Sequence, residues 1–100
     1  MLINAPDVSY EPTCEICRWK IVQLKDFEGN VTQHLVGDER YGGRVSTAIV
    51  KALEDSGYVT ASGRVYKCHG KELSHVDQLS SNARWVLNGF MYTNELEEML

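Results

Sequence analysis

The sequence lacks a long hydrophobic run: no stretch approaches the ~20 apolar residues that a membrane-spanning helix needs. The opening segment, Met1 to Asp7, has no basic residue and no extended apolar core, so it does not resemble a secretory signal. Only three cysteines are present, and an odd number argues against a disulfide framework. These absences predict a protein of the cytoplasm that has no membrane contact.

Sequence signatures of common enzymes are also missing. The chain contains no Gly-x-Ser-x-Gly elbow, no phosphate-binding loop, no His-Glu-x-x-His pair and no calcium loop. A cysteine nucleophile with a histidine base can be drawn in any chain that holds three of each, so that pairing alone indicates nothing. We therefore expect a protein that is not an enzyme and needs no cofactor.

Charge is distributed unevenly along the chain. The net charge is −4, yet all ten Lys and Arg lie between residues 17 and 91, where only eight of the fourteen acidic residues are found. Both ends are therefore acidic and a mildly basic body lies between them. The overall negative sign argues against strong nonspecific binding to nucleic acid.

Local patterns predict one domain over residues 1–100, of the α+β class: a small curved antiparallel sheet of four to five strands, arranged as a meander, with a C-terminal helix packed on it. Residues 1–13 read as an irregular lead-in because Pro6 and Pro12 disfavour helix. The sheet is expected over 17–69, beginning with a strand over 17–26 in which adjacent Ile21 and Val22 indicate a bulge or a two-sided strand.

Three further segments complete this outline. Residues 44–54 fit either a strand or a helix, and periodicity alone leaves both open. Residues 58–68 predict a hairpin that turns at Gly63. An apolar stripe predicts a helix over 75–88 that Ser74 caps and Gly89 ends, and residues 93–100 predict a short acidic helical tail. The expected core comprises Trp19, Ile21, Leu24, Val45, Ile49, Val59, Val65, Tyr66, Leu79, Ala83 and Leu87.

Cys17-Arg-Trp19, Gly43-Arg-Val-Ser-Thr47 and the hairpin from Gly57 to Tyr66, followed by Gly70, are similar to segments of small, functionally uncharacterised phage and prophage proteins. In that group a Cys-x-Trp strand opens a β-meander and a helix closes it. The resemblance covers residues 14–90 and attaches no activity. It implies a strand at 44–54 and a bacterial host cell. It also implies an accessory protein that binds and modulates a host protein, for example a defence or nucleic-acid-processing complex.

Aromatic residues near the end of the chain are compatible with such protein binding. Trp and Tyr dominate the energetics of protein interfaces. The acidic tail could engage a basic partner. The predicted interaction residues are Trp85, Phe90, Met91, Tyr92, Glu95, Glu97 and Glu98.

The alternative is a regulatory module that binds nucleic acid. If residues 46–55 were helical, helix and hairpin would resemble a winged-helix head; otherwise Tyr58, Tyr66 and Trp19 could stack on bases from the sheet. The cationic contacts would come from Arg40, Arg44, Arg64 and Lys67.

Two further possibilities concern metal and oligomeric state. Cys14-Glu-Ile-Cys17 has the spacing of a zinc knuckle, and Cys68 and His75 could complete a zinc site that stabilises the module. The competing interpretation is that the reduced thiols act as small apolar residues. Edge strands of a small meander could also pair across a homodimer.

Overall fold

The computed structural model of the chain describes residues 5–90 and 95–97 and has the α+β class expected from the sequence. The strands are β1 (Thr13–Lys25), β2 (Val31–Glu39), β3 (Gly42–Val45), β4 (Ile49–Leu53), β5 (Gly57–Thr60), β6 (Val65–His69) and β7 (Glu95–Glu97). A 3-10 helix, η1 (Val76–Gln78), precedes the α-helix α1 (Ser81–Phe90). In this part of the chain, no helix has the length and apolar character needed to cross a membrane.

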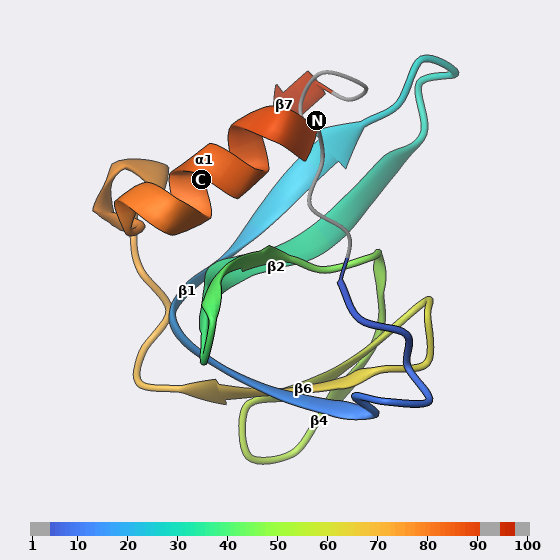
Figure 1. Cartoon of the computed structure of the whole chain (residues 1–100). Helices are drawn as coiled ribbons and strands as arrows, with labels where there is room; N and C mark the ends of the chain where they lie inside the picture. Colours follow the sequence, from blue (N-terminus) through green and yellow to red (C-terminus); the bar gives the residue numbers. More distant parts are fainter. Residues whose placement is uncertain (1–4, 91–94, 98–100) are drawn as a thin grey trace.

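The seven strands form one mixed sheet, not an antiparallel meander of four or five strands. Six of them neighbour one another in the order β3-β2-β1-β6-β5-β4, and β7 pairs with the second half of β1. The first half of β1 runs parallel to β6, from Thr13 opposite Val65 to Cys17 opposite His69. Figure 1 shows β1 curving from its start beside β6 to its end beside β2. β1 is longer than any strand that pairs with it. Its first half pairs with β6 and most of the rest pairs with β2, so this one strand joins the β6 side of the sheet to the β2 side.

A β-bulge in β1 makes this curvature possible. The pairing of β1 with β2 shifts between Cys17 and Lys20, and Arg18 adopts the left-handed φ of 47°. A bulge of this kind bends a strand and changes which side chains face inward. Trp19 and Ile21 pack in one hydrophobic cluster, whereas Val22 packs in the other. Both features expected from the adjacent Ile21 and Val22, a bulge and a two-sided strand, are therefore present.

The core consists of two clusters on opposite sides of β1 and β2. The first lies inside the curve of the sheet and contains Cys14, Ile16, Trp19, Leu35, Tyr66 and Cys68. The second lies between the sheet and α1 and contains Val22, Leu24, Val36, Leu79, Ala83 and Leu87. α1 lies closest to β3 and β2, and its buried residues share the second cluster with Val22 and Leu24 of β1. Five residues of the expected core are only partly buried: Ile21, Val45, Ile49, Val59 and Val65.

The segment left open at 44–54 is extended, as β3 and β4, so the winged-helix alternative is wrong. The predicted hairpin is confirmed: β5 and β6 pair antiparallel with Tyr58 opposite Tyr66, and Gly63 takes a φ of 90° in the turn.

The C-terminal helix begins later than predicted. Residues 75–88 are not one helix, because Leu79 is extended with a ψ of 153° and separates η1 from α1. Ser80 is the actual cap, since its hydroxyl accepts a hydrogen bond from the Ala83 amide at 3.1 Å. The Gln78 side chain instead accepts bonds from the amides of Ser74 and His75. Gly89 lies inside α1 and does not end it.

The predicted boundaries at the two ends also change. β1 starts at Thr13, four residues before the predicted strand. The described part of the 93–100 tail is the strand β7 and not a helical turn. Residues 5–12, which we call the lead-in, are irregular as predicted, with a turn in which the Asp7 carboxylate accepts bonds from the Ser9 amide at 2.9 Å and hydroxyl at 2.7 Å.

Candidate functional site

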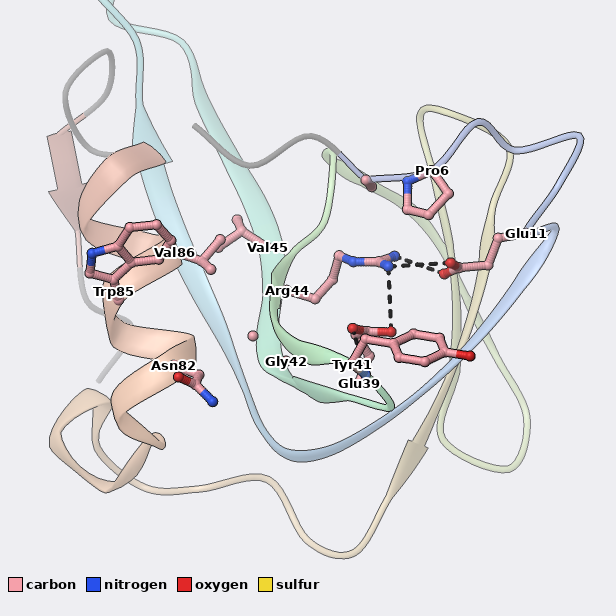
Figure 2. Close-up of a pocket in the computed structure, with 12 residues that line it drawn as sticks. Pro6, Glu11, Glu39, Tyr41, Gly42, Arg44, Val45, Asn82, Trp85 and Val86 are labelled. Atoms are coloured by element: carbon pink, nitrogen blue, oxygen red, sulfur yellow. Dashed lines mark hydrogen bonds and ion pairs between the residues drawn. The ribbon is translucent and has the colours of Figure 1, made fainter. Parts of the chain in front are cut away.

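Two adjacent cavities lie between α1, β3 and the lead-in, and we call them together the groove. Their volumes are about 380 Å³ and about 350 Å³. Both are lined by Ala5, Pro6, Val45 and Val86, so the start of the lead-in lies at their junction. Figure 2 shows Val86 of α1 and Val45 of β3 directed toward each other, and Arg44 directed away from the helix.

Close contact between α1 and β3 fixes one wall of the groove. A Cβ atom at Gly43 would lie 2.5 Å from the Asn82 carbonyl oxygen, so only glycine permits this approach. The hydroxyl of Ser80, the helix cap, also donates a short hydrogen bond to the Asp38 carboxylate of β2. The start of α1 is therefore held to the ends of β2 and β3.

Arg44 is the central charged residue of the groove, although only 7% of its surface is exposed. Its guanidinium lies 2.9 Å and 3.3 Å from the two carboxylate oxygens of Glu11 and 3.6 Å from the Glu39 carboxylate. Dashed lines in Figure 2 mark these contacts. It also donates to the Tyr66 hydroxyl at 3.5 Å. A bidentate pair of this kind gives both strength and orientation.

The pKa values of the pair reflect these contacts. Burial alone would lower the pKa of Arg44, but the hydrogen bonds to Glu11 and Tyr66 outweigh it and raise that pKa. The hydrogen bond from Arg44 lowers the pKa of Glu11, and the burial of its carboxylate only partly opposes this. Both groups are consequently charged at neutral pH.

Arg64 lines the smaller cavity and donates hydrogen bonds to the lead-in. Only 3% of its surface is exposed. Its Nε donates to the Glu11 carbonyl at 2.7 Å, and its Nη2 donates a short hydrogen bond to the Pro6 carbonyl. The two arginines thus connect β3 and the β5–β6 hairpin to residues at both ends of the lead-in.

Two exposed aromatic side chains line the larger cavity. Tyr41, in the turn between β2 and β3, is 83% exposed, and Trp85 of α1 is 60% exposed. Large aromatic residues at this level of exposure contribute little to the core and are well suited to contacts with another molecule.

The residues predicted for protein binding fall into four groups. Trp85 is exposed at the groove. Phe90 is half-buried, packs on the second core cluster and lies with its ring 5.4 Å from that of His34, so it is chiefly a core residue. Glu95 and Glu97 lie in β7, opposite Lys25 and Gln23 of β1. Met91, Tyr92 and Glu98 lie outside the described residues.

The residues predicted for nucleic acid do not form one surface. Arg44 and Arg64 are buried and bonded to the lead-in. Arg40 is exposed, 5.3 Å from the ring centre of Tyr41, and Lys67 is exposed opposite Glu15 on β1. Of the aromatic residues proposed to stack on bases, Trp19 and Tyr66 are buried. Internal ion pairing therefore occupies two of the four predicted cations.

The predicted zinc ligands are not brought together. Cys14 and Cys68 are buried in the first core cluster, whereas Cys17 is exposed and His75 precedes η1. Burial raises the pKa of the Cys14 and Cys68 thiols to about 12, so both stay protonated at neutral pH. Among residues 5–90 and 95–97, no group of three or more His, Cys, Asp or Glu has an arrangement suited to a metal ion.

Several groove residues were not predicted as site residues, namely Pro6, Glu11, Glu39, Tyr41, Asn82 and Val86. One signal could have indicated them. Arg64 directly precedes β6, and alternation places it on the same side as the buried Tyr66. An inward-facing arginine there needs an acceptor from elsewhere in the chain. The acidic, proline-containing lead-in is a natural source of that acceptor.

Comparison with known proteins adds no functional information. No protein-family model matches the chain, and neither a curated protein nor a solved structure shows significant similarity to it.

Proposed function

We propose that the protein is a non-enzymatic binding module that engages another protein through the groove beside α1. The observation that carries this proposal is the position of Trp85, which is 60% exposed on the lining of a cavity of about 380 Å³. An exposed tryptophan next to a concave surface is a common arrangement for an interface anchor.

The surroundings of Trp85 support a protein partner. Tyr41 lines the same cavity and is 83% exposed, so two aromatic side chains are available at one site. Charged and polar groups of Glu39, Arg44 and Asn82 also line it and could provide specificity. The resemblance to phage and prophage proteins implies that the partner is a host protein in the bacterial cytoplasm and that binding modulates this host protein.

A capture experiment with matched variants tests the proposal. The tagged protein is incubated with bacterial lysate, with and without nuclease, and bound proteins are identified by mass spectrometry. We expect one stoichiometric protein that survives nuclease and is lost with Trp85→Ala. The control is Phe27→Ala, which removes an aromatic side chain that is 88% exposed in the turn between β1 and β2.

Two outcomes would contradict the proposal. Equal loss of the captured protein in both variants would show that the groove is not the interface. Binding that disappears with nuclease would support the nucleic-acid alternative instead, with the exposed Arg40 and Lys67 as its cationic contacts.

A further inference from the structure

The lead-in separates two cavities that would otherwise form one continuous groove. Ala5 and Pro6 of the lead-in line both cavities, as do Val45 of β3 and Val86 of α1. Displacing the lead-in would join the volumes of about 380 Å³ and about 350 Å³. The joined groove would extend from Trp85 and Tyr41 at one end to Arg64 and Phe90 at the other.

The contacts of the lead-in resemble those of a bound peptide. It accepts hydrogen bonds from Arg64 through the main-chain carbonyls of Pro6 and Glu11 and binds Arg44 through the Glu11 carboxylate. It contains no α-helix and no strand. Recognition of main-chain carbonyls together with one carboxylate is a common way to hold a peptide segment in a groove.

Charge indicates what could replace the lead-in. Residues 5–12 contain Asp7 and Glu11 and no basic residue. Without Glu11, the groove would contain the two buried positive charges of Arg44 and Arg64 and only one nearby negative charge, that of Glu39. A buried cation that loses its partner is costly, so the empty groove favours an anionic replacement.

We propose that the lead-in is an internal occupant of the groove and that the partner protein displaces it with an acidic segment of its own that folds into a similar turn. This inference rests on the proposed protein-binding function and names the chemistry of the partner at the same site. The incoming carboxylate pairs with Arg44 in place of Glu11, and the incoming main-chain carbonyls accept from Arg64. Binding to the intact protein is weakened by the fraction of molecules in which the lead-in covers the groove.

A peptide-binding measurement tests this directly on the full chain. The first probe is a fluorescein-labelled peptide with the sequence of residues 5–12, Ala-Pro-Asp-Val-Ser-Tyr-Glu-Pro. The second probe has Asn and Gln in place of its Asp and Glu. Fluorescence anisotropy gives the affinity of each probe for the wild type and for Glu11→Ala, which removes the carboxylate that binds Arg44.

We expect Glu11→Ala to bind the acidic probe about tenfold more tightly than the wild type, as for a lead-in that covers the groove in about nine of ten molecules. The amide probe should bind Glu11→Ala clearly more weakly than the acidic probe. The matched control is Glu15→Ala, which removes an exposed glutamate of β1 that lies beside His69 and outside the groove.

A second variant covers the case in which Glu11→Ala fails to fold. Asp7→Ala removes the acceptor of the Ser9 bonds and loosens the lead-in while the pair between Arg44 and Glu11 remains. We expect a smaller increase in affinity in the same direction. No increase in either folded variant, or equal binding of the two probes, would overturn the inference. The assay needs no natural partner, so its failure is separate from failure of the capture experiment.

Discussion

The guanidinium of Arg44 on β3 lies 2.9 Å from the carboxylate of Glu11 in the lead-in, thirty-three residues earlier in the chain. This pair connects the irregular start of the described chain to the sheet. Both residues also line the larger cavity. Stability and access to the groove therefore depend on the same contact.

Removing Arg44 should destabilise the protein strongly. Arg44→Ala leaves Glu39, whose side chain is only 10% exposed, without its cationic partner. Loss of one member of a buried ion pair costs about 3 kcal/mol or more. Urea unfolding measures the change in the free energy of unfolding. The control is Arg40→Ala, at an exposed neighbouring position, where we expect a loss of about 0.5 kcal/mol. Similar losses in both variants would contradict the central role of Arg44.

Adding one methyl group at Gly43 should disturb the contact between β3 and α1. A Cβ there would meet the backbone of Asn82 and Ala83 at 2.5 to 2.7 Å, and backbone atoms cannot rotate away. We expect Gly43→Ala to lower the free energy of unfolding by about 1–3 kcal/mol. At Gly57, also in a strand and buried, the nearest atom would lie 3.4 Å away. Gly57→Ala should therefore be well tolerated, and a larger loss there than at Gly43 would refute the prediction.

Local sequence patterns predicted elements well where their contacts are close in the chain. The hairpin of β5 and β6 is an example, because Gly63 permits the turn that brings Tyr58 opposite Tyr66. The start of α1 was placed wrongly because Ser74 and Ser80 are both acceptable caps. The extended Leu79, whose side chain is buried in the second core cluster, decides between them.

Features that depend on distant contacts were not predicted. The parallel pairing of β1 with β6 has no local signal in the sequence of either strand. An isolated segment at 95–97 suits a helical turn, but its backbone pairs with β1 instead. The Cys-x-x-Cys spacing gives a zinc knuckle only if the chain turns between the two cysteines, so that both thiols face one metal ion. In the strand β1, Cys14 faces the core and Cys17 faces solvent.

Stability should fall at mildly acidic pH because of His34. Its Nδ1 hydrogen is donated to the Ser46 carbonyl at 2.8 Å, so Nε2 accepts from the Thr32 hydroxyl at 2.6 Å and the ring is neutral. Burial lowers the pKa of His34 below 6.5, and the bond to Ser46 only partly opposes this. Below pH 6.5 the unfolded state therefore binds more protons than the folded state, and stability decreases until the folded pKa is reached.

Thermal unfolding followed by circular dichroism between about pH 5 and pH 8 measures this dependence. We expect a constant melting temperature above pH 6.5, a decline below it, and a smaller decline in His34→Gln. The lowered pKa of Glu11 adds a separate loss of stability below its ordinary value of 4.5, which a second scan extended below that pH measures and which Glu11→Gln should reduce. A melting temperature that rises as the pH falls from 6.5 would contradict the assigned protonation of His34.

The three cysteines should differ in reactivity. Burial raises the pKa of Cys14 and Cys68 to about 12, whereas Cys17 is exposed. Because the thiolate is the reactive form, iodoacetamide at about pH 8 should modify Cys17 alone in the folded protein and all three after unfolding. Mass spectrometry identifies the modified residues. Protection of Cys17 that a chelator abolishes would instead support the zinc hypothesis, which the metal content of protein purified without chelator tests independently.

The edge strand β4 is where we expect two copies of the chain to associate. It is last in the strand order and pairs, among the described strands, only with β5, while Val50 is 63% and Leu53 38% exposed. Exposed apolar edges favour pairing with another strand. In an antiparallel pair that sets Ala52 opposite Leu53, Lys51 of one copy would oppose Glu54 of the other.

Sedimentation velocity at increasing concentration tests for this dimer. Val50→Lys places a charge on the edge and should shift the protein to monomer. Phe27→Lys is the matched control, since it introduces the same charge at an apolar side chain that is 88% exposed outside β4, and it should leave the dimer intact. A wild type that is monomeric at every concentration would contradict the prediction. Equal dissociation of both variants would place the interface away from β4.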